Sequence, residues 1–228
     1  MMYFGGKHRV AKDIVSVINT FRTDCSVWFF EPFIGGANVI TKLHGNRVAS
    51  DANKDLIRLY RAMQEGLVLP KHVSEEEYRR AKEGQCDPRL RAFIGFGCSF
   101  AGKWFGGYAK SGMRNYAVNA ARSLEKKRPG LIGIRLFDRP YQDFTPRGMV
   151  IYCDPPYQGT TQYGAVGGFD SSTFWITMSK WCRNNVVLVS EYNCPINSDT
   201  VWEKEVITDI RGKDGRISRV EKLFFVKQ

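Results

Sequence analysis

A short apolar run, Met149–Cys153, is followed directly by Asp154-Pro155-Pro156-Tyr157. A run of this length bounded by turn residues predicts a buried β-strand. Each proline fixes φ near about −65°, and Pro156 forces Pro155 into an extended conformation, so the chain leaves the strand through a stiff turn. The turn presents a carboxylate, a carbonyl oxygen without a competing N–H group, and an aromatic ring that can stack on a base. These groups suit a planar base with an exocyclic amine, although an ordinary strand-to-loop turn has the same pattern.

A second strand-to-turn junction lies near the N-terminus. Val27–Phe30 reads as a buried strand, and the glycine-containing turn Glu31–Gly36 and a helical stretch follow it. The next strand, Arg47–Ser50, ends at Asp51. This order is the front half of a nucleotide-binding α/β unit, in which Asp51 can accept hydrogen bonds from ribose hydroxyls. Asp51 could instead cap the following helix, and the turn is not G-x-G-x-x-G, so a dinucleotide or ATP phosphate site is poorly supported.

The order of the remaining segments indicates the fold class. Helical spacing predicts helices within Lys7–Phe21, over Asn53–Met63 and around Ser172–Arg183. Two β-rich segments, Lys204–Ile210 and Ile217–Val226, flank an Asp-Gly turn signal and predict a hairpin with a loop longer than two residues. We expect an α/β protein with a Rossmann-like mixed sheet that ends in an antiparallel hairpin. Its core would comprise residues 1–64 and 130–228, and residues 65–129 would form a small inserted subdomain.

Composition narrows the class of partner. The formal net charge is +11 and the sequence pI is about 9.5, which favours a polyanionic partner, nucleic acid first, over a basic surface without a partner. No apolar run is long enough for a membrane span, so we expect no membrane association. The six cysteines are scattered without a C-x-x-C pair and the three histidines lie far apart, so no metal site is expected. The chain reads as a cytoplasmic protein with reduced thiols.

Four motifs, in this order along the chain, resemble those of the Dam-type (class D12, α-group) DNA adenine N6-methyltransferases. They are Tyr3-Phe-Gly-Gly-Lys7, Glu31-Pro-Phe-Ile-Gly-Gly36, Ser50-Asp-Ala-Asn-Lys-Asp-Leu-Ile57 and Asp154-Pro-Pro-Tyr157. The similarity continues through Phe105-Gly-Gly-Tyr108, Ser190-Glu-Tyr-Asn193 and Arg219-Val-Glu-Lys-Leu223. The compact chain resembles small phage-borne members of the family, found in bacteria or phage-infected cells. It does not indicate whether a restriction-modification partner exists.

The resemblance implies S-adenosylmethionine as cofactor and assigns roles to individual residues. The N-terminal motif would close over the cofactor, the glycine turn would lie against its methionine part, and Asp51 would bind its ribose. Asp143 is a candidate contact to its adenine. The implied cofactor-binding residues are Tyr3, Gly6, Lys7, Glu31, Phe33, Gly35, Asp51 and Asp154. The implied catalytic residues are Asp154, Pro155, Pro156 and Tyr157.

The chemistry of adenine suggests how these residues would act. The N6 lone pair is delocalised into the ring, so we expect Asp154 and the Pro155 carbonyl to accept N6 hydrogen bonds and to aim the nitrogen at the methyl group. The base must leave the duplex stack, with Tyr157 as its stacking partner and loop 158–170 folding over it. No covalent enzyme intermediate is needed. Cys153 reads as a small buried strand residue.

Basic residues interleaved with aromatic residues predict the contacts to double-stranded DNA. A solvated helix face or a polar hairpin tip would show a similar composition. The candidate DNA-binding residues are Lys103, Trp104, Tyr108, Lys110, Arg114, Arg211, Lys213 and Arg216. We expect a monomer in solution that can dimerise on DNA. The alternatives are an N4-cytosine or RNA N6-adenine methyltransferase, and a non-catalytic DNA-binding module that retains the fold; the intact Asp154–Tyr157 motif argues against the last.

Overall fold

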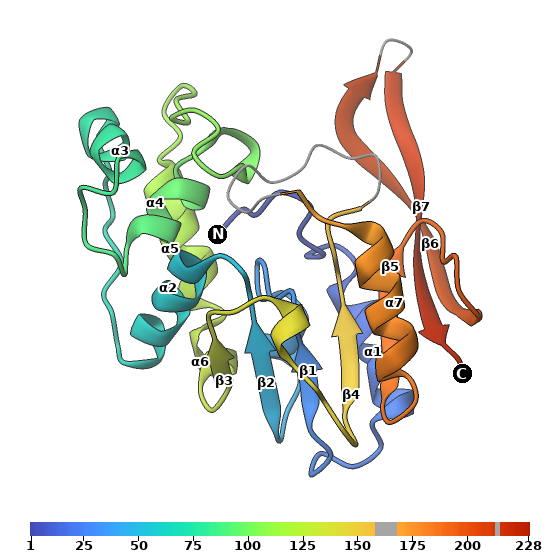
Figure 1. Cartoon of the computed structure of the whole chain (residues 1–228). Coiled ribbons are helices and arrows are strands. Elements are labelled where there is room, and N and C mark those ends of the chain that lie inside the picture. Colours follow the sequence, from blue (N-terminus) through green and yellow to red (C-terminus); the bar gives the residue numbers. More distant parts are fainter. Residues whose placement is uncertain (158–167, 213–214) are drawn as a thin grey trace.

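A single mixed sheet organises the chain, as seen in a computed structural model that describes residues 1–157, 168–212 and 215–228. Its seven strands have the order β3-β2-β1-β4-β5-β7-β6. The strands are β1 (Phe29–Glu31), β2 (Arg47–Ser50), β3 (Arg135–Phe137), β4 (Val150–Cys153), β5 (Val186–Glu191), β6 (Ser198–Gly212) and β7 (Gly215–Val226). Strands β1 to β5 pair in parallel, and β7 is antiparallel to both β5 and β6. This confirms the predicted Rossmann-like mixed sheet with a terminal antiparallel hairpin (Figure 1).

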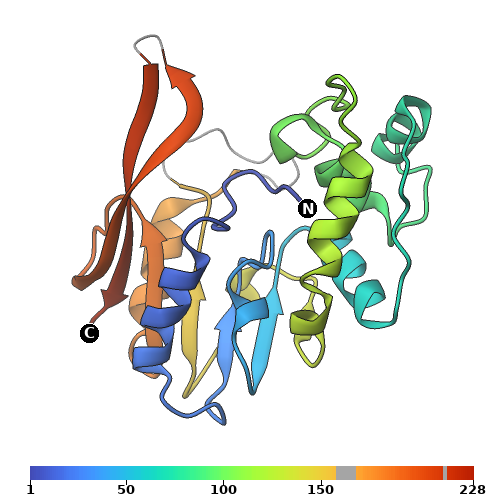
Figure 2. The same cartoon turned by 180° about the vertical axis from the view of Figure 1, so that it is seen from behind.

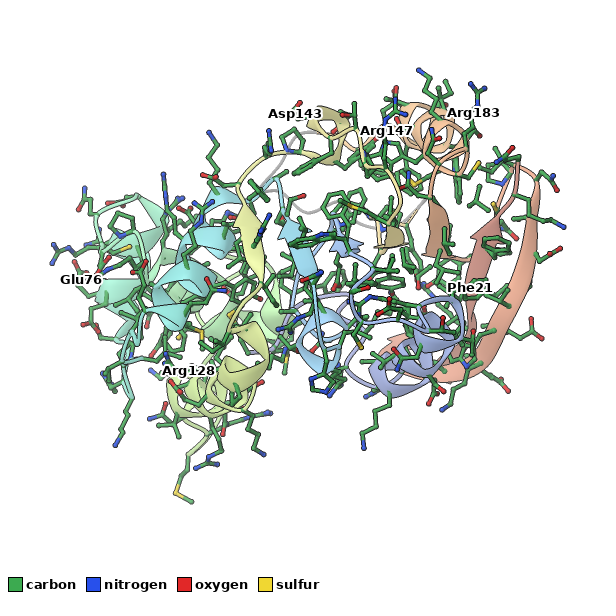
Figure 3. The ribbon with its side chains drawn as sticks, turned by 90° about the horizontal axis from the view of Figure 1, so that it is seen from below. Phe21, Glu76, Arg128, Asp143, Arg147 and Arg183 are labelled. Carbon is green, nitrogen blue, oxygen red and sulfur yellow. The ribbon has the colours of Figure 1, made fainter. Side chains whose placement is uncertain are left out.

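The parallel strands are buried on both faces of the sheet. Along β4, Val150 and Tyr152 belong to one buried cluster, and Ile151 and Cys153 belong to the other. Helix α1 (Ala11–Phe21) contributes to the first cluster and α7 (Ser171–Trp181) to the second, so the two helices cover opposite faces (Figure 2). Figure 3 shows the same arrangement from below, with Phe21 of α1 and Arg183 on opposite sides of the sheet.

Several helices connect β2 to β3. They are α2 (Lys54–Gln64), α3 (Glu75–Lys82), α4 (Arg91–Gly97), α5 (Tyr116–Glu125) and α6 (Arg128–Leu131), with a short 3-10 helix, η2 (Phe100–Gly102). Residues 65–129, the predicted insertion, begin after α2 and end within α6. Asn53, rather than Asp51, caps α2, because its side chain accepts hydrogen bonds from two backbone N–H groups of the first turn. Phe93 and Phe96 of α4 belong to the same buried cluster as residues of the sheet, so the insertion shares the hydrophobic core of the protein. Figure 1 places the insertion and the hairpin at opposite ends of the sheet, with the N-terminal segment between them.

Two local predictions were wrong. The helix expected after the glycine turn is only a single 3-10 turn, η1 (Ile40–Lys42), because Val39, Ile40 and Thr41 are β-branched and Leu43 is already extended. The hairpin strands pair as far as Gly212 and Gly215, so the loop is not longer than two residues. Glycines beside the turn supply the backbone freedom that such a short hairpin needs.

Some predicted features fall outside the described residues. These are Lys213 and most of the expected loop 158–170. Within the described ranges, no helix is long and apolar enough to cross a membrane. The same ranges contain no cluster of three or more His, Cys, Asp or Glu side chains that could hold a metal ion.

Candidate active site

Three acidic residues meet at the carboxyl edge of the sheet. Glu31 ends β1, Asp51 directly follows β2, and Asp154 directly follows β4. Strand β1 lies between β2 and β4, so the chain order reverses at this point. In open α/β sheets, ligands bind at such a switch point, outside the carboxyl ends of the strands. The sheet therefore brings together the three acids that the sequence motifs singled out.

Asp154 is paired with a lysine from the N-terminal segment. Lys7 Nζ lies 2.8 Å from Asp154 Oδ1, and the side chains are only 8% and 19% exposed, respectively. Burial raises the pKa of Asp154, and the Lys7 ammonium partly offsets that effect. The two carboxylates near Lys7 raise its pKa despite burial, so the lysine stays charged. Lys7, predicted to lie over the cofactor, thus reaches the catalytic motif itself.

Tyr157 connects this ion pair to the hairpin. Its hydroxyl donates a hydrogen bond of 2.8 Å to Glu221 Oε2 on β7. Lys7 Nζ lies 4.4 Å from the centre of the Tyr157 ring, and the ring of Tyr192 meets it edge-on at 4.7 Å. Arg219 donates to the Tyr192 hydroxyl at 2.9 Å. The aromatic ring of the motif is therefore held between the N-terminal segment, β7 and the loop after β5.

The glycine turn after β1 is fastened to the end of β2. Gly35 has φ +42°, and its N–H donates to Asp51 Oδ2 at 3.0 Å. Tyr60 of α2 donates its hydroxyl to the Gly35 carbonyl at 2.6 Å. A Cβ placed on Gly35 would lie 3.0 Å from Cε1 of Tyr3, and one on Gly6 would lie 3.0 Å from Nδ2 of Asn38. The N-terminal motif thus packs on the glycine turn at a distance that side chains would prevent.

Asp51 is a buried hydrogen-bond acceptor at this turn. Its other oxygen, Oδ1, accepts the Asn53 N–H at 2.9 Å. Burial raises the pKa of Asp51 to about 6, although these backbone hydrogen bonds oppose the shift. Each carboxylate oxygen has two acceptor sites, so Asp51 can still receive hydroxyl donors from a ligand.

A lysine outside all the sequence motifs forms hydrogen bonds to the same glycine turn. Lys127, between α5 and α6, donates to Asn38 Oδ1 at 2.7 Å and to the Gly36 carbonyl. Burial lowers the pKa of Lys127 to about 8. Glu31 accepts the Ile40 N–H at 2.9 Å, and burial raises the pKa of Glu31 well above its usual range. Only the folded chain brings Lys127 beside these residues, which lie about 90 positions earlier in the sequence.

An aromatic cluster borders the turn on the α7 side. The ring centres of Phe33 and Tyr141 lie 5.1 Å apart, and Phe174 packs against both rings. The Tyr141 hydroxyl is buried without a hydrogen-bond partner among the described residues. Asp143, by contrast, is exposed at the molecular surface (Figure 3). The contact of Asp143 with the cofactor adenine therefore stays a prediction.

Comparison with known proteins covers the first three motifs. Residues 3–85 match the family model of the D12 class N6 adenine-specific DNA methyltransferases. Over these residues, the chain is similar to this family. This match does not test whether the chain resembles the phage-borne members of the family in particular. No curated protein matches the whole sequence significantly.

Several solved structures resemble the chain weakly. The rRNA methyltransferase aviRa of Streptomyces viridochromogenes has 14% identity and a TM-score of 0.44, over 98% of this chain and 86% of that one. PH1948 of Pyrococcus horikoshii, a candidate RNA methyltransferase, has 10% identity and a TM-score of 0.44, over 96% and 84% of the respective chains. SMU.472, a candidate methyltransferase complexed with S-adenosylhomocysteine, has 12% identity and a TM-score of 0.38, over 96% and 52%. These values are too low to assign a substrate.

The D12 match and the sheet topology make the chain a methyltransferase with S-adenosylmethionine as its cofactor. The residues at the switch point fit this group chemically. Asp51 offers a buried carboxylate for ribose hydroxyls, and the Gly35 turn gives close access to backbone. The Tyr141 hydroxyl, which has no hydrogen-bond partner within the described ranges, offers a further polar group. When bound, the cofactor supplies an electrophilic methyl group on its sulfonium.

The predicted DNA-binding residues fall into two groups. Lys103, Lys110 and Arg114 are exposed on the connection between α4 and α5. Trp104 packs against Phe96 and Phe105, and the Tyr108 hydroxyl donates to the Val73 carbonyl at 2.8 Å, so both rings are part of the packing of the insertion. In the hairpin, Arg211 and Arg216 occupy paired backbone positions.

Sequence reasoning overlooked the most exposed aromatic side chain of this region. Phe100 is 69% exposed and begins the turn of η2. The turn is rigid: the Phe100 N–H donates to the Gly107 carbonyl, and Ala101 is held at φ 54°. Gly102 accepts a hydrogen bond of 3.1 Å from the Phe4 N–H, which links the turn to the segment that carries Lys7. The signal available in the sequence was an aromatic residue among small residues, Ser99-Phe100-Ala101-Gly102.

Proposed function

We propose that this methyltransferase transfers the methyl group of S-adenosylmethionine to N6 of an adenine extruded from duplex DNA. The observation that carries the proposal is the position of Asp154 and Pro155 at the end of β4, beside the glycine turn and Asp51. The D12 match over residues 3–85 supports adenine in DNA as the substrate. The formal net charge of +11 suits a polyanion.

Asp154 and the Pro155 carbonyl orient the target amine. Each accepts one N6 hydrogen bond, which directs the nitrogen lone pair at the methyl carbon. The cofactor, held at Asp51 and the Gly35 turn, would supply the methyl group and leave as S-adenosylhomocysteine, and the surplus N6 proton would pass to the Asp154 carboxylate. Positioning of two substrates in this way contributes up to about 7–11 kcal/mol to such reactions.

The Lys7 ammonium keeps Asp154 available as an acceptor. Burial alone raises the pKa of Asp154 and favours its neutral form, which has one acceptor fewer. The lysine at 2.8 Å favours the carboxylate. Lys7 also covers one face of the Tyr157 ring. An adenine that stacks on Tyr157 must therefore use the other face or displace Lys7.

The duplex would lie across the carboxyl edge, between the helical insertion and the hairpin (Figure 1). Lys103, Lys110 and Arg114 would contact phosphates. Phe100 stands exposed on a rigid turn tied to the N-terminal segment, so it would fill the space that the extruded base leaves. Apolar side chains that enter a base stack act in this way in other DNA-binding proteins.

A parallel comparison of three nucleic acids tests which one is the substrate. Duplex DNA of mixed sequence, single-stranded DNA and structured RNA are each incubated with enzyme and labelled S-adenosylmethionine, and the nucleosides are separated by mass. We expect N6-methyladenine from duplex DNA. N4-methylcytosine, or N6-methyladenosine from RNA alone, would replace the proposal by that activity. No label in any pool, with cofactor binding intact, would favour a non-catalytic DNA-binding module.

A further inference from the structure

Glu221 of β7 is a second carboxylate near the Lys7 ammonium. Its Oε2 atom lies 3.6 Å from Lys7 Nζ and accepts the Tyr157 hydroxyl at 2.8 Å. Like Asp154, Glu221 has a side chain that is only 19% exposed. Lys7 therefore has two carboxylate partners, a near one that the proposed reaction uses and a farther one for which that reaction gives no role.

The target amine and Lys7 compete for the same carboxylate. When N6 donates to Asp154, the Lys7 ammonium must give up part of its contact at 2.8 Å. The lysine side chain is 8% exposed, so little water can replace that contact. A buried charge that loses its partner is strongly unfavourable. A second carboxylate within a short movement of Nζ removes this penalty.

We propose that Glu221 is a positioning residue for methyl transfer, which receives the Lys7 ammonium when the target amine engages Asp154 and holds Tyr157 in place through its hydroxyl. This inference rests on the proposed function. The exchange makes and breaks no covalent bond and moves no proton, because Lys7 remains charged throughout. It requires only that Nζ shift from one carboxylate toward the other.

Removal of the Glu221 charge has a consequence with a defined sign. Burial raises the pKa of Asp154, Lys7 lowers it, and Glu221 raises it. Without Glu221, Lys7 stays on Asp154, so the pKa of Asp154 falls and the acid limb of kcat/KM moves to lower pH. The other titratable groups of this pocket remain in place in such a variant. They are Glu31, Tyr152, Tyr157 and Tyr192.

The variant Glu221→Gln tests the inference, with Glu203→Gln as matched control because Glu203 is an exposed glutamate of the same hairpin. We expect E221Q to lower kcat about tenfold with little change in KM, and to move the acid limb to lower pH. E203Q should leave both at wild-type values. Lys7→Gln combined with E221Q should lose no more activity than Lys7→Gln alone, because the amide oxygen of the glutamine can still accept the Tyr157 hydroxyl and only the exchange with Lys7 is lost. A wild-type kcat in E221Q, or a loss without the shift of the limb, overturns the inference.

A second measurement separates this inference from the proposed function. Protein with ¹³C-labelled aspartate carboxyl groups is titrated by NMR without DNA, and the Asp154 resonance is assigned with Asp154→Asn. The pKa of Asp154 should be lower in E221Q than in wild type and unchanged in E203Q. An unchanged value in E221Q overturns the role of Glu221. Absence of product from wild-type enzyme on DNA contradicts the proposed function instead, whatever the titration shows.

Discussion

Lys7 Nζ lies 2.8 Å from Asp154 Oδ1, so a cation from the N-terminal segment is paired with the acid at the end of β4. The two residues are 147 positions apart in the numbering, and only the sheet brings them together. Because the same lysine contacts the Tyr157 ring, the N-terminal motif and the Asp154–Tyr157 motif form one site.

Asp51 gives cofactor binding a pH dependence. Its pKa is raised to about 6, and ribose hydroxyl donors favour the carboxylate. Affinity for S-adenosylhomocysteine should therefore be highest well above pH 6 and fall as pH decreases through that value, by up to about tenfold per unit. Calorimetry at several pH values on both sides of this pKa measures the change. Asp51→Asn should bind more weakly and without the dependence; if it retains the dependence, another group is responsible.

Lys127 should support the cofactor turn. Lys127→Met removes the hydrogen bonds to Asn38 and to the Gly36 carbonyl. Unmet buried acceptors cost about 1–3 kcal/mol, so we expect a loss of stability of that size and weaker cofactor binding. Lys126→Met is the matched control, because Lys126 is the exposed neighbour. Denaturant unfolding and calorimetry test both effects, and equal behaviour of the two variants would contradict the assignment.

Phe100 should assist base extrusion without contributing to the fold. Phe100→Ala removes an exposed ring, so stability should change by less than about 0.5 kcal/mol. Fluorescence of 2-aminopurine at the target position should rise less on binding than with wild type. Val68→Ala, a change at an exposed apolar residue between α2 and α3, serves as control. Full fluorescence in Phe100→Ala would remove this residue from the proposed contact surface.

Lys103 and Arg114 should contribute to the salt dependence of DNA binding. Each phosphate contact contributes about −0.9 to the slope of log K against log salt. The double variant Lys103→Gln, Arg114→Gln should make that slope shallower by about 1.8. Lys12→Gln, at an exposed position of α1, should leave it unchanged. A slope of wild-type size in the double variant would place both residues outside the DNA contact.

Much of the sheet and part of the site followed from local sequence. Apolar runs that end in an acid located β2 and β4, and the Asp-Gly signal located the hairpin. The helix predicted after the glycine turn failed because β-branched residues and the fold around Arg47 override an apolar pattern there; the Arg47 guanidinium donates to the Gly130 and Ile132 carbonyls. Lys127 carries no motif signal of its own, and Glu221 lies in the Arg219–Leu223 segment, to which the sequence analysis assigned no role. Their roles arise from β7 and the α5–α6 junction, which long-range packing alone brings to the site.

The most direct test of the account is the product on duplex DNA from wild type and from Asp154→Asn. Both proteins are first shown to be folded and to bind S-adenosylhomocysteine with similar affinity. Wild type should yield N6-methyladenine, and Asp154→Asn should lower the single-turnover rate by a factor on the order of 10² or more, because the carboxylate that orients the amine is lost. Methylation by Asp154→Asn at the wild-type rate, or a wild-type product other than N6-methyladenine, would contradict the account.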